Sequence, residues 1–185
     1  MKQNLKTILI ILGILALTVV ALNMLGHSTI CPCGYLQIWG GIAGEDTSQH
    51  FFDYYTYSHV IHGMAFFFLL WLFARKIPMQ WKLTIAVLIE AGWEILENSP
   101  IIINRYREHT IALDYYGDSI VNSISDIGAM IFGFWLASKL PVWVVIALVV
   151  VLELVVLYLI RNNLTLNILM LVYPLDAIRR WQAGE

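Results

Sequence analysis

Polar side chains recur at helical spacing in three segments of this 185-residue sequence. Residues three, four or seven positions apart share one face of a helix, so each segment would carry a polar stripe along one side. The stripes comprise His59 and His62; Glu90, Glu94 and Glu97 with the adjacent Asn98; and Asp118, Asn122 and Asp126. Three such stripes predict that the helices carrying them face one interior volume.

These side chains offer both metal ligands and proton carriers. Histidine nitrogens combined with carboxylate oxygens suit Zn, Mn or Fe, and a set with fewer histidines suits Mg or Ca. A metal in such a site would polarise a phosphoryl or carbonyl oxygen and lower the pKa of a bound water. Protons, arginine or a divalent metal must supply the charge that matches these carboxylates, and a metal cofactor would be Zn, Mn or Mg. The candidate ligands are His59, His62, Glu94, Asp118, Asn122 and Asp126.

Other residues are candidates for catalysis and for substrate binding. Carboxylates can accept and return protons during a reaction. The candidate catalytic groups are Glu90, Glu94 and Asp118. Guanidinium groups bind anionic head groups, so Arg105 and Arg161 are candidate substrate contacts, together with Asn98. We expect a pocket with carboxylates on its walls and guanidinium groups at its rim.

Each of these features also has a purely structural interpretation. The two histidines could be hydrogen-bonded residues at a helix interface, and the glutamate stripe could join helices, as polar side chains do in membranes. Arg105 and Arg107 could face solvent or lipid phosphate. An ionised side chain at bilayer depth costs at least ~2.5 kcal/mol and usually marks a functional site. The three stripes together therefore favour function.

The elements that must position these residues are strongly apolar. The chain is 59% hydrophobic with a mean hydropathy of +0.73, which excludes an ordinary soluble domain. Apolar runs of about 20 residues can cross a bilayer as helices. We expect spans at about 8–25, 59–73, 83–97, 119–137 and 142–160. The predicted fold class is an all-α, polytopic transmembrane bundle that forms a single domain over residues 1–185.

The C-terminal apolar stretch, 164–178, has two interpretations. Pro174 and Asp176 favour a short re-entrant or interfacial helix on the outer side. Arg179 and Arg180 favour a sixth span that ends in the cytoplasm. We lean towards six spans, because the arginine pair follows the apolar stretch directly.

Basic residues predict the orientation of the bundle. Lys2, Lys6, Arg75, Lys76, Lys82 and Lys139 lie at one set of helix ends, and Arg105, Arg107 and Arg161 lie at the other. The loop 26–53 contains neither Lys nor Arg. The positive-inside rule therefore predicts a bacterial inner-membrane protein with a cytoplasmic N-terminus, and it places the polar stripes at the outer helix ends. The first span lacks a small-x-small cleavage site, so we expect an uncleaved anchor.

Partners are limited by the charge pattern. The chain has 11 basic and 13 acidic residues and no basic run. A protein that binds nucleic acid would need such a run or patch to neutralise phosphates. We expect membrane lipids as partners and no nucleic acid.

Cys31 and Cys33 are separated by Pro32 alone. A disulfide across one residue fits the usual Cα separation and torsion badly, and two thiolates could instead hold a soft metal. The spacing is not C-x-x-C, and these are the two cysteines of the chain. We expect free or intermittently oxidised thiols in a glycine-rich loop.

Four sequence runs resemble a known bacterial family. They are Glu90–Pro100, Ile111–Asn122, Arg161–Asn167 and Tyr173–Leu175. They are similar to a bacterial inner-membrane group catalogued as uncharacterised protein family number 0314, a domain of unknown function, and the resemblance extends over residues 31–181. More distantly, the layout is similar to VanZ-like membrane proteins, which implies a role in the cell envelope. Neither resemblance names a reaction.

Three functions are compatible with the sequence. The leading one is a metal-dependent hydrolase or transferase acting on a lipid or lipid-linked envelope substrate. A proton- or metal-coupled transporter would use the same carboxylates but needs a path to the cytoplasm, and segments 66–73 and 127–135 carry no charge. A non-catalytic envelope assembly or resistance factor is the third. The sequence contains no nucleophile elbow, phosphate-binding glycine loop or His-Glu-x-x-His motif.

Overall fold

The long apolar runs of the sequence fold as helices. A computed structural model describes residues 2–41 and 46–185, and within these ranges the chain forms eight helices and no strand beyond one isolated β-bridge. Four helices are long and apolar enough to cross a membrane: α1 (Lys2–Met24), α2 (Thr56–Phe73), α5 (Ile120–Lys139) and α6 (Val142–Ile160). The predicted all-helical bundle is confirmed.

The predicted third span lies within α3 (Met79–Glu97). This helix has 19 residues, which is long enough to cross, but Lys82 and its three glutamates make it too polar to rank with the four apolar helices. It packs against α1, α2 and α5, and Glu90 and Glu94 of its polar stripe are buried. A short helix, α4 (Pro100–His109), follows directly.

A continuous sixth span over 164–178 is not formed. The chain instead makes α7 (Leu164–Val172), of nine residues, and α8 (Asp176–Ala183), of eight. Pro174 separates them, since proline lacks a backbone N–H and disfavours helix in the residue before it. Both helices are far shorter than the ~20 residues that a crossing requires. The prediction of a sixth span is therefore corrected to two short helices.

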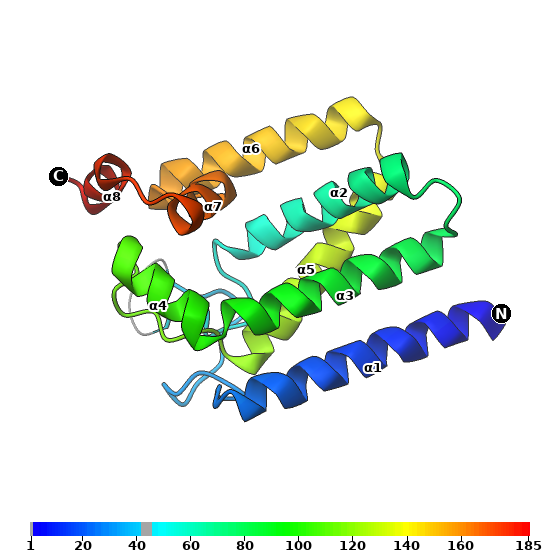
Figure 1. Cartoon of the computed structure of the whole chain (residues 1–185), viewed down its shortest axis with the longest axis horizontal. Coiled ribbons are helices and arrows are strands. Elements are labelled where there is room, and N and C mark those ends of the chain that lie inside the picture. Colours follow the sequence, from blue (N-terminus) through cyan, green and yellow to red (C-terminus); the bar gives the residue numbers. More distant parts are fainter. Residues whose placement is uncertain (1, 42–45) are drawn as a thin grey trace.

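The helices gather their connections at two opposite ends. α1, α2, α3 and α6 run roughly side by side, and α5 crosses between them (Figure 1). One end, which we call the loop end, carries α4, α7, α8 and the described parts of the long loop between α1 and α2. Positions 42–45 of the predicted outer loop 26–53 lie outside the described residues. The N-terminus and the two tight turns lie at the other end.

The cysteines of the long loop form a disulfide, so the expectation of free thiols is wrong. Cys31 is bonded to Cys33. The chain turns at residues 32 and 33, and this turn leaves the two Cα atoms 5.1 Å apart. That separation lies within the range disulfides adopt, which is why one intervening residue suffices.

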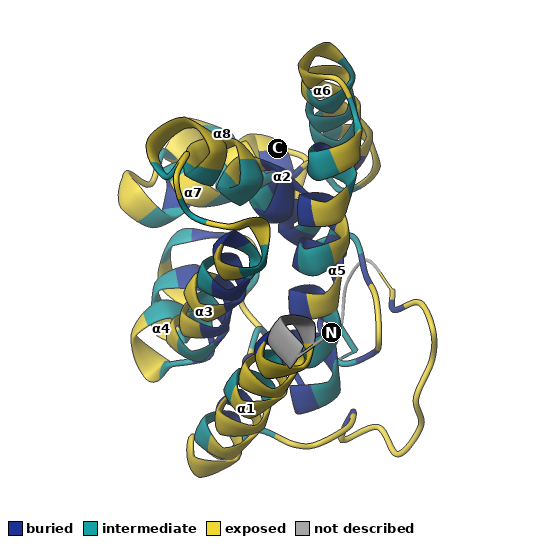
Figure 2. Ribbon diagram, turned by 90° about the vertical axis from the view of Figure 1, so that its right-hand side faces the viewer, coloured by how far each residue is buried: buried dark blue, intermediate teal, exposed yellow. Residues whose placement is uncertain are grey.

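Burial is concentrated where α2, α3 and α5 face one another. In Figure 2 the buried residues lie on the facing sides of these helices, whereas α6 is exposed along most of its length. A compact apolar cluster fills the middle of the bundle and comprises Ala86, Val87, Ala91, Ile127, Met130 and Phe134. Partly buried Phe66, Phe67 and Leu70 of α2 pack against it. The exposed apolar surface of α6 suits contact with lipid.

Two glycines set the closeness of α2 and α5. A Cβ atom on Gly63 would overlap the backbone carbonyl of Met130, and one on Gly133 would overlap the backbone of Val60. Small residues allow membrane helices to approach backbone to backbone, where van der Waals contact is greatest. This contact fixes the distance between His59 on α2 and Asp126 on α5.

We predict that Gly133→Ala lowers the free energy of unfolding by about 1–3 kcal/mol, the usual cost of overpacking, because two backbones must separate to admit the methyl group. Thermal unfolding in detergent measures the change. Gly128→Ala on the same helix is the matched control, since its Cβ would meet nothing within 4 Å, and alanine is the better helix former. Equal melting temperatures for the two variants would contradict this account of the α2–α5 contact.

Candidate functional site

The centre of the polar site is His59, one turn into α2. Its Nδ1 lies 2.6 Å from Oε1 of Glu90 on α3, a distance typical of a charge-assisted hydrogen bond. His62, one turn further along, places its Nδ1 3.1 Å from the same oxygen. Glu90 is fully buried, and its carboxylate accepts hydrogen bonds from both histidines. The two predicted stripes on α2 and α3 therefore meet.

Glu94 and Asp126 lie on either side of the His59 ring. Oε1 of Glu94 is 3.4 Å from His59 Nδ1, and Oδ2 of Asp126 is 3.9 Å from His59 Nε2. Both carboxyl groups are buried. Both oxygens of Glu94, and Oδ1 of Asp126, have no hydrogen-bond partner within the described chain. A buried polar atom without a hydrogen-bond partner lowers the stability of the folded protein by about 1–3 kcal/mol, and a charged atom lowers it by more.

Asp118 belongs to a second network, centred on Asn98. The Asn98 amide donates to Asp118 Oδ2 (3.0 Å), to Ser123 Oγ (3.3 Å) and to the carbonyl of Glu94 (3.0 Å). Its own oxygen accepts the backbone N–H of Asp118 at 2.6 Å. Asn98 is fully buried. Its predicted role in substrate binding is thus joined by a structural one, because it ties the end of α3 to the start of α5.

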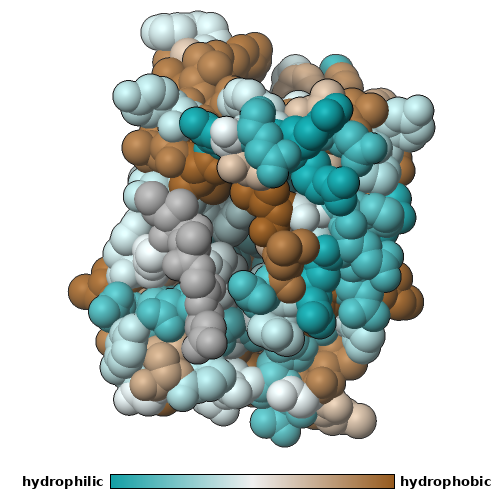
Figure 3. Space-filling view, turned by 90° about the vertical axis from the view of Figure 1, so that its left-hand side faces the viewer, coloured by the Kyte–Doolittle hydropathy of each residue, from teal (hydrophilic) through white to brown (hydrophobic). Residues whose placement is uncertain are grey.

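A cavity of about 260 Å³ opens beside these networks at the loop end. The face of the molecule at this end is largely hydrophilic and is interrupted by apolar patches (Figure 3). The polar residues of its lining include His59, Glu97, Asp118, Asp126, Tyr55, Tyr106, Tyr115, Asn162 and Asn167. Apolar walls come from the segment 111–113. The cavity has the mixed lining of a small-molecule site.

Two tyrosines hold the cavity carboxylates. Tyr106 donates its hydroxyl proton to Glu97 Oε1 at 2.9 Å, and Tyr115 donates to Asp118 Oδ1 at 2.9 Å. Burial raises the pKa of each of these two phenols well above the ordinary value for tyrosine, so both hydroxyls remain hydrogen-bond donors at neutral pH. Burial also raises the pKa of Asp118, and the hydrogen bonds from Asn98 and Tyr115 oppose that rise. Asp118 is therefore a group that could carry a proton.

Asn122 does not join the His59 cluster. Its amide donates to the backbone carbonyl of His50 at 2.9 Å, so it anchors the long loop to α5. The sequence placed it on the same face as Asp118 and Asp126. The long loop covers that face, and its His50 carbonyl accepts the Asn122 amide, which is therefore not bonded to the histidines of α2.

The two predicted head-group arginines are engaged at the ends of the C-terminal helices. Arg105 donates to the carbonyls of Leu171 (2.5 Å) and Val172 (3.4 Å), at the end of α7. Arg161 donates to the carbonyl of Trp181 at 3.2 Å, near the end of α8. Neither arginine lines the cavity. Cations stabilise the carbonyl-rich ends of helices, which accounts for both positions.

Several residues of the cavity were not among the predicted site residues. Tyrosine is common at membrane surfaces, so residue type alone does not single out Tyr55, Tyr106 or Tyr115 as site residues. Asn162 donates to Asn167 Oδ1 (2.9 Å) and to the Tyr55 hydroxyl (3.3 Å). The run Arg161-Asn-Asn was one signal for this wall, since polar amides directly after a long apolar helix need buried partners.

Comparison with known proteins gives one family. The model of the family described as Protein of unknown function (DUF2585) matches residues 22–184. The UPF0314 protein of Sinorhizobium fredii is 51% identical over 94% of this chain and 88% of its own length. Those of Rhizobium meliloti (52%; 94% and 88%) and Paracoccus denitrificans (50%; 92% and 89%) are similarly close. VanZ-like proteins do not appear among these matches. No solved structure matches.

We predict that Asn98→Leu lowers the free energy of unfolding by several kcal/mol, because it leaves the buried Asp118 without two of its hydrogen bonds. Asn104→Leu makes the same chemical change on the exposed surface of α4 and should change the free energy of unfolding by about 0.5 kcal/mol or less. Denaturation of both purified variants in detergent provides the comparison. An Asn98 variant as stable as the Asn104 variant would show that the network is dispensable.

Proposed function

Since this chain belongs to the DUF2585 family, together with the bacterial UPF0314 proteins, we propose its function from the chemistry of its site. It is a multi-pass protein of the bacterial inner membrane whose outer end binds a divalent metal. With that metal it carries out hydrolysis or group transfer on a lipid or lipid-linked substrate of the envelope.

The proposal is carried by the buried carboxylate oxygens that lack a hydrogen-bond partner, both oxygens of Glu94 and Oδ1 of Asp126. They are buried beside His59, next to the apolar cluster that fills the middle of the bundle. Among the described residues, the only cationic groups within ion-pair distance of Glu90, Glu94 and Asp126 are the imidazoles of His59 and His62. Glu97 adds a further carboxylate close to His59 and Glu94. Acidic groups thus outnumber histidines, and a divalent cation offsets the excess.

The contacts of His59 fit a metal ligand held by a second carboxylate. A proton on Nδ1, shared with Glu90 at 2.6 Å, leaves the lone pair of Nε2 on the side of Asp126. Metal-binding histidines commonly donate their other N–H to a carboxylate, which fixes the tautomer and the ring orientation. The proposed ligands are therefore His59 and Asp126, joined by Glu94, whose carboxylate now lies beside the Nδ1 edge of the ring and has to rotate towards Nε2. Glu90 is a positioning residue.

Of the other predicted ligands, His62 lies against Glu90, and Asp118 and Asn122 have partners elsewhere. Asp118 remains useful as a proton carrier, because it lines the cavity and is held by Tyr115. Glu97 has the corresponding position with Tyr106. A bound divalent metal would polarise a substrate oxygen and acidify a bound water.

The apolar core favours an enzyme over a transporter. The cluster that includes Val87, Met130 and Phe134 lies one to two helical turns beyond the carboxylates, towards the end that carries the N-terminus. A transported ion would have to cross this packed region, where an unsolvated charge is very costly. A cavity that is closed on one side suits chemistry at one membrane surface. A substrate from the envelope is expected because the cavity lies at the outer end in the proposed orientation.

We predict a cytoplasmic N-terminus and five crossings, with the loop end outside, from the distribution of basic residues. Reporter fusions at Gly41 and after Glu185 should both give the signal of the outer compartment, and a fusion in the turn at Leu140 should give the cytoplasmic one. A cytoplasmic signal at Gly41 would reverse the orientation. A cytoplasmic signal only after Glu185 would restore a sixth crossing.

We predict that the purified protein carries about one divalent metal per chain and that Glu94→Gln removes it. Glu90→Gln should weaken the affinity by about 10–100-fold, as loss of a positioning carboxylate does. Glu108→Gln, on the exposed surface of α4, is the control and should retain the metal. Mass spectrometry measures metal content, and melting with and without chelator measures the linkage to stability. No metal in the wild type, with a melting temperature indifferent to chelator, removes the metal from the proposal.

The same samples test the reaction. The wild type and Glu108→Gln, reconstituted with an inner-membrane lipid extract, should convert a lipid component detectable by mass spectrometry. Glu94→Gln and chelated wild type should not. If metal is bound but no lipid changes, the site serves a different function, and the non-catalytic or transport functions take precedence.

A further inference from the structure

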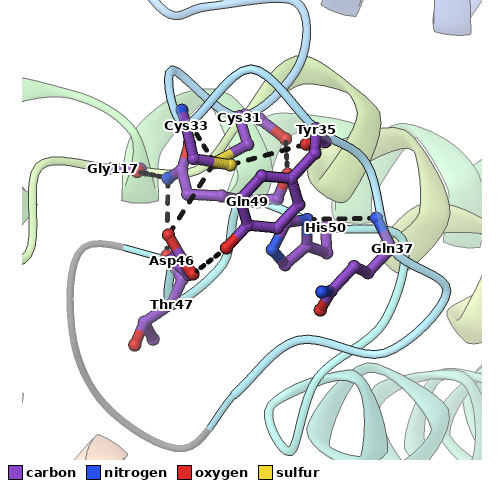
Figure 4. The surroundings of a disulfide bond; sticks show 10 residues. Cys31, Cys33, Tyr35, Gln37, Asp46, Thr47, Gln49, His50 and Gly117 are labelled. Atoms are coloured by element: carbon purple, nitrogen blue, oxygen red, sulfur yellow. Dashed lines mark hydrogen bonds between the residues drawn. A yellow bond between two sulfur atoms is a disulfide. The ribbon is translucent and has the colours of Figure 1, made fainter.

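A second group of metal-ligating side chains lies in the long loop, apart from the cavity. It consists of Cys31, Cys33, Asp46 and His50. One ligand atom from each of the four lies within 4.8 Å of those of the others. Figure 4 shows the disulfide, the Asp46 carboxylate and the His50 ring gathered around Tyr35. The proposed function uses none of these residues.

The non-sulfur members of this group are already held in place. The Tyr35 hydroxyl donates to Asp46 Oδ2 at 2.6 Å, and the Tyr35 ring stacks on His50 with centroids 5.3 Å apart. His50 is 1% exposed, and its Nε2 has no hydrogen-bond partner within the described chain. A buried ring nitrogen without a partner needs an explanation, and a metal in this cluster would give one.

The sulfurs differ in access. Cys33 is exposed and Cys31 is buried. Sγ of Cys31 accepts the backbone N–H of Cys33 at 3.1 Å and lies 4.0 Å from Asp46. A dithiol reductant can therefore attack Cys33, and Cys31 leaves as a thiolate that an N–H group stabilises.

We propose that reduction of the Cys31–Cys33 disulfide creates a zinc site, with both thiolates, His50 and Asp46 as ligands. The dithiol donates two electrons and two protons, becomes a disulfide itself, and leaves two cysteine thiols. Zinc then binds both sulfurs and releases their two protons. Two thiolates, an imidazole and a carboxylate form a four-coordinate set of the types that Zn²⁺ prefers.

His50 can join this set at small cost. Its Nδ1 now accepts the backbone N–H of Gln37 at 3.3 Å, which is a long hydrogen bond. Gln37 is exposed, so water replaces the ring as acceptor when the ring proton moves from Nε2 to Nδ1 and the lone pair of Nε2 binds zinc. The remaining contacts of Tyr35 and Asp46 keep the ring and the carboxylate where they are.

The site would act on the wall of the cavity. Between its ligands Asp46 and His50 lies the segment 47–49, which lines the cavity. Gln49 donates to the carbonyl of Gly117 at 2.8 Å, and Ser119 donates to the carbonyls of Ser48 and Gln49. Bound zinc would fix both ends of this segment, at Asp46 and at His50. In the disulfide state, the contact with the sulfurs is at the Asp46 end, where Oδ1 lies 4.0 Å from Sγ of Cys31.

Cobalt titration of the full-length protein in lipid nanodiscs tests the proposal. Thiolate ligands give cobalt a charge-transfer band in the near ultraviolet, which a site of histidine and carboxylates does not produce. We expect the band in protein reduced with a phosphine, its absence in oxidised protein, and its displacement by Zn²⁺. Glu94→Gln should retain the band in full, so failure of the membrane site and failure of this site are distinguishable.

Variants separate a built site from chelation by the thiols alone. Cys31→Ser/Cys33→Ser should abolish the band, and His50→Gln and Asp46→Asn should each weaken cobalt binding at least about tenfold. His109→Gln, on α4 and outside both clusters, should bind as the wild type does. Circular dichroism verifies that each variant is folded. The proposal is overturned if reduced wild type lacks the band, or if His50→Gln and Asp46→Asn both bind cobalt as tightly as wild type.

Discussion

An acidic side chain inside an apolar helical bundle must be matched by a cation or by hydrogen-bond donors, and most of the loop end is organised by this requirement. Glu90 meets it with two histidines, Asp118 with Asn98 and Tyr115, and Glu97 with Tyr106. Both oxygens of Glu94 and Oδ1 of Asp126 are the exceptions. Protein interiors seldom leave such groups unmatched, and these two carboxylates lie on either side of one imidazole, where the proposed metal would match them.

The polar site depends on an apolar contact some distance from it. Gly63 and Gly133 let the backbones of α2 and α5 touch. Ala86, Val87 and Ala91 of α3 pack against this pair of helices in the apolar cluster. Small residues on all three helices keep the bundle narrow. The histidines of α2 therefore reach carboxylates on both neighbours, although each stripe lies on a separate helix.

Much of this arrangement could be predicted from sequence, because helical periodicity fixes which face a residue occupies. His59, Glu90, Glu94 and Asp126 meet as their spacing indicated. Asn122 shares that face, yet the loop captures its amide. Arg105 and Arg161 cap short helices whose position depends on where Pro174 breaks the chain. Such outcomes follow from loop paths and from competition among partners, and spacing along one helix carries no information about either.

Glu153 in α6 has a consequence for the order in which the chain is made. Its carboxylate accepts the backbone N–H groups of Leu164 and Thr165 and the Thr165 hydroxyl, all from the first turn of α7. A carboxylate well inside a span has no such donors until the ribosome has synthesised α7. In a bilayer, the stable integration of α6 would therefore await a segment translated after it, and α7, though too short to cross, would complete the helix that precedes it.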